Sequence, residues 1–420
     1  MPVFGLLSTL VCLAAAFSLL SYRFLRLPRT VGVMLLSLGC SLLVAVVGRF
    51  VPGLHARAAA LVSHIDFSAV VLHGMLAFLL FAGAMQLDVN ALRRQKAPVL
   101  SLSILGTALS TLIVATLLKG VLDITGLHAG WILCLLFGAL ISPTDPIAVL
   151  EMLRRVGAPS TLEAQLSGES LLNDGVGAVI FLTLLASFSS GQAPTIGSFT
   201  WHLLIQSGGG IALGLILGYI AYRLLRIVDS VRVEELLTLA LAMGGYALAD
   251  ALHLSAPLEV VAAGLLASAR ARPYAMSQET RTRVDQFWDL IDDLMNVILF
   301  LLIGLEILVM PWNPRYIYAG LLAIPVALAA RWLSVRVSLL VVRPWHKPMR
   351  GSIAALTWGG LRGGLAVALA LSITPGRFHD RILAITYIVV IFAIVVQGLT
   401  MSGLLRRLGL ASSARAEIRA

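Results

Sequence analysis

The sequence predicts an all-α polytopic membrane protein with about 13 transmembrane helices. Of its 420 residues, 59% are hydrophobic and only 12% are charged, which is more apolar side chain than the interior of a soluble protein can hold. The apolar residues also fall into a long series of stretches of about 20, the length of helix that spans the hydrocarbon core of a bilayer. Lys and Arg alternate between rich and poor loops along the series, as expected for a chain that crosses a membrane repeatedly.

Apolar windows, with the Gly, Pro and Arg residues that bound them, place each span along the chain. The first six are expected near 3–22, 31–48, 67–87, 97–118, 130–150 and 160–187, and the seventh near 201–222. The last six are expected near 235–250, 256–269, 286–309, 317–341, 351–373 and 382–405. Residues 1–405 would then form one transmembrane domain, followed by a short cytoplasmic tail at 406–420.

The net charge of +10 is dispersed over short loops, so it does not form the clustered basic face that binds nucleic acid. Loops that follow odd-numbered spans and the tail hold 22 Lys and Arg residues, against 6 in the other loops and 3 within spans. Because positive residues accumulate on the cytoplasmic side, we expect the N-terminus outside and the C-terminus in the cytoplasm. The first apolar run has no basic residue before it, which favours a retained span over a signal peptide.

The three cysteines, Cys12, Cys40 and Cys134, all lie inside apolar runs. This placement favours packing over a disulfide framework or a resident metal site. No cofactor is expected.

Two predicted spans contain helix-breaking residues. The fifth holds Pro143 and Pro146, and proline removes a backbone donor and clashes with the preceding turn. The twelfth holds two glycine pairs, 359–360 and 363–364, around Arg362. Seven positions separate these spans in order, so they enter the membrane in opposite directions. This pattern predicts two inverted six-span repeats, 1–190 and 235–405, joined by a linker helix at 201–222, with a transport site between the broken helices.

Four charged residues, Asp145, Glu169, Asp174 and Arg362, are predicted to lie deep in the membrane. An ionised side chain there costs about 2.5–3.5 kcal/mol, so the four would cost roughly 10 kcal/mol without partners. On a helix, Glu169, Ser170, Asn173 and Asp174 would share one polar sector. We therefore expect the charged groups to share one hydrated cavity.

Oxygen atoms dominate this predicted site, and a hard cation such as Na⁺ prefers oxygen ligands. The Asp145 and Asp174 carboxylates, the Ser170 hydroxyl and the Thr144 backbone carbonyl would supply the shell. Burial favours the protonated carboxyl whereas a bound cation favours the ionised one. A cation and a proton would therefore compete for the same carboxylate oxygens.

Three segments in this order resemble the signatures of NhaP-type sodium/proton antiporters, relatives of the eukaryotic sodium/hydrogen exchangers. They are Thr144-Asp145-Pro146, Glu169-Ser170-x-x-Asn173-Asp174-Gly175 and Trp358-Gly359-Gly360-Leu361-Arg362-Gly363-Gly364. The resemblance implies an NhaA/NhaP-like fold, a homodimer and exchange of Na⁺ or Li⁺ for H⁺. It also implies that Asp145 and Asp174 carry cation and proton alternately, that Glu169 pairs with Arg362 with support from Asn173, and that Asn173 goes with electroneutral one-for-one exchange.

A K⁺/H⁺ or broad monovalent cation/H⁺ antiporter of the same architecture stays open, since selectivity depends on small differences in oxygen positions. Enzyme motifs are missing, and a channel fits poorly with inverted broken helices. A bacterial inner membrane is the expected location.

The remaining charged residues have plainer interpretations. Arg331 and Arg336, near the end of the eleventh span, are expected to reach the membrane interface by snorkelling. Glu306 is expected to be interfacial. Surface solvation or the funnelling of cations, and not coordination, is expected for four acidic residues at predicted span ends, Asp66, Asp88, Asp250 and Glu259.

Overall fold

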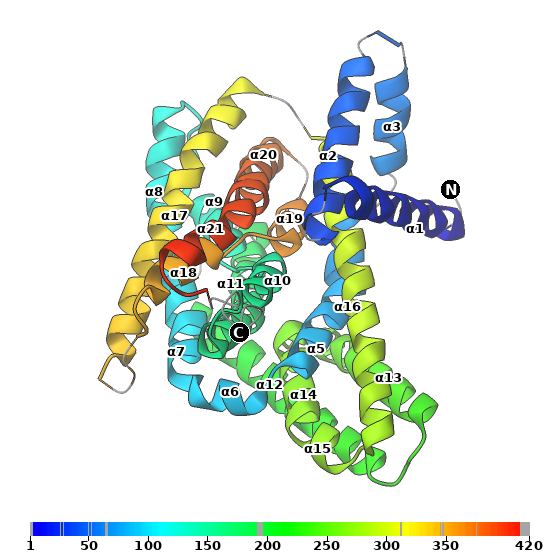
Figure 1. The fold of residues 1–420 in the computed structure, drawn as a ribbon. Helices are drawn as coiled ribbons and strands as arrows, with labels where there is room; N and C mark the ends of the chain where they lie inside the picture. The colour runs from blue at the N-terminus through cyan, green and yellow to red at the C-terminus, as the bar shows by residue number, and fades with distance from the viewer. Residues whose placement is uncertain are drawn as a thin grey trace, which may run out of the picture.

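The computed structural model describes residues 3–411 except 26, 28, 49, 52, 64–65, 191–195, 311–312, 345, 347 and 375. The described chain is helical (Figure 1) and its only β-type pairing is an isolated bridge between Asp145 and Leu361. Part of the predicted tail, 412–420, lies outside the described residues. The helices of the first half are α1 (Val3–Leu20), α2 (Arg29–Val47), α3 (Leu54–Ser63), α4 (Phe67–Ala69), α5 (Leu76–Gln86), α6 (Val89–Arg94), α7 (Lys96–Leu100), α8 (Thr107–Ile124), α9 (Trp131–Ile141), α10 (Ile147–Val156) and α11 (Ser160–Ser190).

The described residues of the second half are also mainly helical. Its helices are α12 (Ile196–Leu225), α13 (Val231–Ala251), α14 (Ala256–Leu266), α15 (Arg272–Tyr274), α16 (Gln278–Glu306), α17 (Pro314–Val342), α18 (Ser352–Gly359), α19 (Gly364–Leu371), α20 (Arg377–Phe392) and α21 (Leu399–Arg407). Five π-helical stretches continue α-helices without a break: η1 (Ser21–Leu25), η2 (Val70–Met75), η3 (Ser101–Gly106), η4 (Ala267–Ala271) and η5 (Ala393–Gly398).

Each of the 13 predicted spans corresponds to one described helix or to consecutive helices. Eight of them are long and apolar enough to cross a membrane on length and composition alone. Two of the other five are broken in the middle, and the remaining three, centred on α13, α14 and α16, contain charged residues such as Glu234, Glu259 and Asp292. The all-α polytopic fold is confirmed, whereas the exact bounds of the two repeats and of the linker at 201–222 stay predictions.

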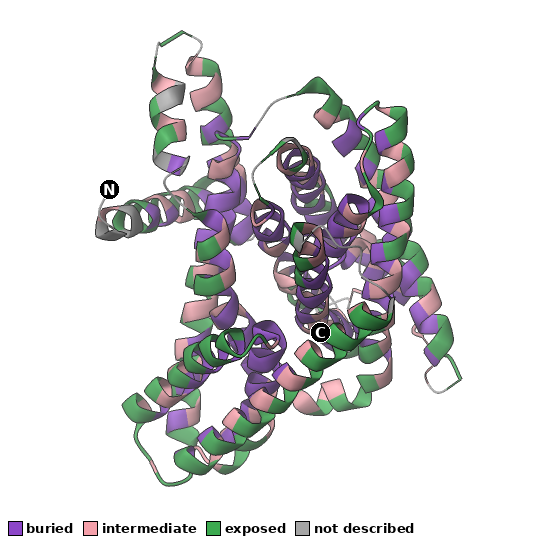
Figure 2. Cartoon of the chain, turned by 180° about the vertical axis from the view of Figure 1, so that it is seen from behind, coloured by how far each residue is buried: buried purple, intermediate pink, exposed green. Residues whose placement is uncertain are grey.

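The helices form two neighbouring groups (Figure 1). In one, α12 packs against α14 and α13, and α14 packs against α5. In the other, α8 packs against α9 and α17, and α17 packs against α20. Figure 2 shows buried residues concentrated on the central helices and exposed ones on the periphery. Peripheral helices such as α12 expose apolar side chains, including Leu215 and Ile216, as a lipid-facing surface requires.

Both predicted helix breaks are present. Residues 142–146 separate α9 from α10, and 360–363 separate α18 from α19. The two breaks meet, because the Asp145 N–H donates a hydrogen bond to the Leu361 carbonyl at 2.9 Å. Each extended segment therefore satisfies part of the other's backbone, which an apolar environment demands of any non-helical chain.

Glu259 corrects one sequence prediction. It does lie at a helix end, in the first turn of α14, but its side chain is fully buried instead of solvated. Neither carboxylate oxygen has a hydrogen-bond partner within the described chain. The Glu259 carboxylate packs against Gly245 of α13, where a Cβ atom would lie only 2.3 Å from the Glu259 Oε1 atom. The absence of a side chain at Gly245 therefore leaves room for the carboxylate. By contrast, Asp66, Asp88 and Asp250 are exposed, as predicted.

Candidate functional site

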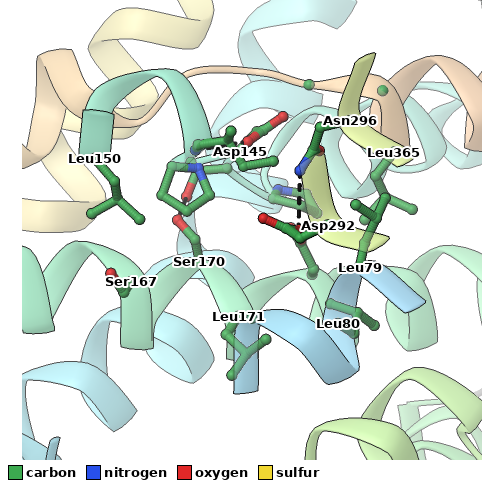
Figure 3. Close-up of a pocket in the computed structure, with 18 of the residues that line it drawn as sticks. Leu79, Leu80, Asp145, Leu150, Ser167, Ser170, Leu171, Asp292, Asn296 and Leu365 are labelled. Carbon is green, nitrogen blue, oxygen red and sulfur yellow. Dashed lines mark hydrogen bonds between the residues drawn. The ribbon is translucent and has the colours of Figure 1, made fainter. Parts of the chain in front are cut away.

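A cavity of about 150 Å³ lies where the broken helices meet α5, α11 and α16. Water occupies roughly 30 Å³ per molecule in the liquid, so this cavity can hold a few waters or a partly hydrated small ion. Asp145, Asp174, Thr144 and Ser170 all line it, and Figure 3 shows Asp145 and Ser170 in the cavity wall. The structure thus brings together the four residues that the sequence predicted as ligands. Their role in ion binding stays a prediction.

Asp145 is held in place by backbone contacts on both sides. Besides the hydrogen bond to Leu361, its Oδ1 accepts the Ile147 N–H at 3.0 Å, at the start of α10. Gly363 of the other break packs directly against it, since a Cβ atom there would lie only 2.2 Å from Asp145 Oδ2. Glycine at 363 is therefore required for the close approach of the second broken helix to this carboxylate.

Three buried polar residues connect α11 to the break before Asp145. The Asn173 Oδ1 atom accepts the Thr144 N–H at 3.2 Å, and Asn173 Nδ2 donates to Thr144 Oγ1 at 2.9 Å. The hydroxyls of Thr144 and Ser170 lie 2.9 Å apart. Because Thr144 follows Pro143 in a non-helical segment, these bonds replace those that a continuous helix would provide. Asn173 therefore supports Thr144, and not the glutamate–arginine pair for which it was predicted.

The predicted pair of Glu169 with Arg362 is wrong. Glu169 is fully buried and forms a bidentate ion pair with Arg331, through Oε1 to Nη1 and through Oε2 to Nη2 at 2.9 Å. Arg331 also donates to the Leu356 carbonyl from Nη2 at 3.1 Å. The snorkelling prediction for Arg331 fails because this residue lies in the interior of α17 and faces the neighbouring helices, with 4% of its surface exposed. Arg336 is exposed and stacks on Trp332 at 5.2 Å.

Arg362 has a different task in the structure. Its Nη1 donates to the carbonyls of Ser142 and Pro143, each at 3.3 Å. These carbonyls follow the end of α9, where the helix macrodipole places partial negative charge. A guanidinium in the second break thus neutralises the exposed carbonyl end of the first.

Sequence reasoning missed two cavity residues, Asp292 and Asn296 of α16. The Asn296 Nδ2 atom donates to the Asp292 Oδ1 atom at 3.0 Å (Figure 3). A signal was available, because Asp289, Asp292 and Asp293 all fall inside the predicted tenth span. Intramembrane carboxylates mark functional positions by default.

Comparison with known proteins gives a consistent result. Residues 7–407 match the family described as "Sodium/hydrogen exchanger, transmembrane". The chain is 42% identical to the Na(+)/H(+) antiporter NhaP of Pseudomonas aeruginosa over 408 residues, which is 96% of each chain. It is 35% identical to the Na(+)/H(+) antiporter NhaH of Halobacillus aidingensis over 354 residues, 82% of this chain and 84% of that one.

The fold is similar to that of a solved structure, the sodium proton antiporter MjNhaP1 from Methanocaldococcus jannaschii at pH 8. The TM-score is 0.77 at 21% sequence identity, and the match covers 97% of this chain and 99% of the other. At that identity the likeness concerns the fold alone.

Proposed function

Because this chain belongs to the sodium/hydrogen exchanger family, we propose that it exchanges Na⁺ for H⁺ across a membrane by alternating access. The observation that carries the proposal is the pair of carboxylates, Asp145 and Asp174, in one cavity between broken helices. Neither has an ion-pair partner within the described chain. Their charge is therefore available to a cation or to protons.

The two ions compete for the same oxygens. A cation that enters the cavity stabilises the ionised carboxylates, and a proton that binds them removes the charge that holds the cation. An empty site with two negative charges in a low-dielectric interior is costly. Only the Na⁺-loaded and the protonated forms would then change between the outward-open and inward-open states. The flux of Na⁺ is therefore coupled to the flux of protons.

The proposed ion shell consists of the Asp145 and Asp174 carboxylates, the Ser170 hydroxyl and the Thr144 backbone carbonyl. The hydroxyl contact between Thr144 and Ser170 supports it, since it keeps these two residues at the same place on the cavity wall. All four residues line the cavity, and all the donor atoms are hard oxygens. Glu169 supports the site through Arg331, and Arg362 supports it through the carbonyls that precede Thr144. The proposal needs no cofactor.

Asn173 favours electroneutral one-for-one exchange. This residue lies next to Asp174 and uses its amide to bind Thr144. An amide cannot take up or release a proton in the physiological range. Position 173 thus adds no exchangeable proton beside Asp174, which favours the smaller number of protons per cation.

The cavity is lined by Gln86 and Arg154, which lie in or beside the predicted loops after the third and fifth spans, and these two loops hold five Lys and Arg residues. On the positive-inside rule, these loops are cytoplasmic, so this form would open inward, with the N-terminus outside. The protein would act as a homodimer in a bacterial inner membrane. Exchange of K⁺ is the second candidate, but the names of the curated relatives favour Na⁺.

Proton release from everted vesicles tests the proposal. Addition of Na⁺ or Li⁺ should release protons from vesicles with the wild-type chain, and Asp174→Asn or Asp145→Asn should abolish that release. Asp293→Asn is the matched control, because Asp293 is an exposed α16 residue paired with Arg29 at the surface. Release driven equally well by K⁺ would favour the second candidate. Normal exchange in the variant with both cavity aspartates replaced would overturn the proposal.

A further inference from the structure

Helix α16 carries a line of polar residues that leads into the cavity. At 100° per residue, Asp285, Asp289, Asp292 and Asn296 fall within a sector of about 60° on one face of the helix. Asp285 is neutralised by Arg272 at 2.6 Å, and Asp289 is exposed. Asp292 is the first carboxylate of this line that contributes to the cavity wall, and Asn296 lies one turn deeper.

Asn296 presents an unsatisfied oxygen at this point. Only 2% of the residue is exposed, and it lines the cavity beside Asp292 (Figure 3). Its Nδ2 donates to Asp292, but its Oδ1 has no hydrogen-bond partner within the described chain. A buried amide oxygen without a partner is unfavourable. A bound cation would satisfy it.

Asp292 also lacks a neutralising partner, although Asp285 and Asp293 on the same helix have theirs. Asp293 pairs with Arg29, and the cavity residue Arg154 is engaged by Glu163 at 2.6 Å. Among the described residues, no Lys or Arg lies within ion-pair distance of Asp292. The cavity therefore holds three unpaired carboxylates and not only the two that the proposed exchange uses.

We propose that Asp292 and Asn296 form a second cation site at the entrance of the cavity. It takes up a hard monovalent cation through one carboxylate oxygen and the Asn296 amide oxygen, and passes it to Asp145 and Asp174. This inference rests on the proposed function, because it assigns an entry step to the same transport. Asp292 is not needed for the exchange of ions at the inner pair, so it sets the apparent affinity for the cation and not the maximal rate.

Transport kinetics give the first test. Asp292→Asn should raise the KM for Na⁺ about tenfold, the lower end of the effect expected from a charged cleft that concentrates counter-ions, with the maximal rate within about twofold of wild type. Asp292→Glu should keep the wild-type KM, and Asp293→Asn serves as the control of equal charge on the same helix. The difference in KM should shrink when choline chloride raises the ionic strength, because salt screens a charged entrance. A purely structural role would not produce that salt dependence.

Direct binding gives the second test. In a chain with Asp145→Asn and Asp174→Asn, radioactive Na⁺ should still bind the purified protein, and the addition of Asp292→Asn should remove that binding. An unchanged KM for Na⁺ in Asp292→Asn, or equal Na⁺ binding in the double and triple variants, would overturn this inference. The proposed function would still hold in that case, as long as the wild-type chain exchanges Na⁺ for H⁺. If the wild-type chain shows no Na⁺/H⁺ exchange at all, the proposed function fails instead.

Discussion

Replacing Glu169 by Gln should destabilise the protein far more than a typical polar substitution. Glu169 and Arg331 expose 0% and 5% of their side chains, and two parallel hydrogen bonds join them. Without the carboxylate, the Arg331 guanidinium keeps its charge in the protein interior with only the Leu356 carbonyl as a partner. Removing one member of a buried ion pair costs about 3–5 kcal/mol. At roughly 2 cal/mol/K per residue for a chain of 420 residues, the melting temperature should fall by about 3–6 °C.

A double-mutant cycle on the purified protein in detergent measures the pairing directly. Thermal unfolding is compared for wild type, Glu169→Gln, Arg331→Gln and the double variant. The double variant should lose less stability than the two single variants together, because each single variant leaves an unpaired charge and the double variant leaves none. A second cycle between Glu169 and Arg362 should show little coupling, since Arg362 donates to the Ser142 and Pro143 carbonyls instead.

The reverse outcome would refute this reasoning. If Glu169 couples more strongly to Arg362 than to Arg331, then the pair inferred from the family resemblance is the functional one. A loss of less than about 1 kcal/mol in Glu169→Gln would equally contradict a buried pair.

Four other expectations concern the transport site and the helix interfaces. Gly363→Ala should abolish exchange with the protein still folded, because the added Cβ atom would lie 2.2 Å from Asp145 Oδ2. Gly244→Ala is the control, because a Cβ atom at Gly244 would have no atom of another described helix within 4 Å. Normal exchange in Gly363→Ala would contradict the close packing of Gly363 against Asp145. Glu259→Met should raise the melting temperature, because it removes a buried carboxyl group whose lack of hydrogen bonds within the described chain costs about 1–3 kcal/mol of stability. Glu279→Met, at an exposed residue in the first turn of α16, should have little effect. A lower melting temperature in Glu259→Met would contradict the absence of a partner for Glu259. Exchange in proteoliposomes should not change when a potassium diffusion potential is imposed, and a rate that follows the potential would rule out one-for-one exchange. At low pH the KM for Na⁺ should rise without a loss of maximal rate, because protons compete for the same oxygens; a maximal rate that falls at constant KM would contradict competition.

The sequence alone was sufficient for the all-α polytopic fold and for the two broken helices. Apolar stretches of spanning length and the alternation of basic loops depend on composition, which needs no knowledge of packing. Pro143 and Pro146 in one span, and the glycine pairs around Arg362 in another, predict breaks from local backbone chemistry. Asp145 and Asp174 could be assigned to one cavity because charged side chains deep in a membrane are costly, so they are expected to share one hydrated space.

Only the tertiary structure decided which charges are partners. Glu169 has Arg331 as its partner and not Arg362, and 162 positions along the chain separate this pair. Asp292 likewise reaches the cavity from a helix far away in sequence. Helical periodicity determines the direction in which a side chain points from its own helix, but not which helix packs against that face. That choice depends on the packing of all the helices together, and hence the contacts between helices, unlike the helices themselves, could not be deduced from local sequence.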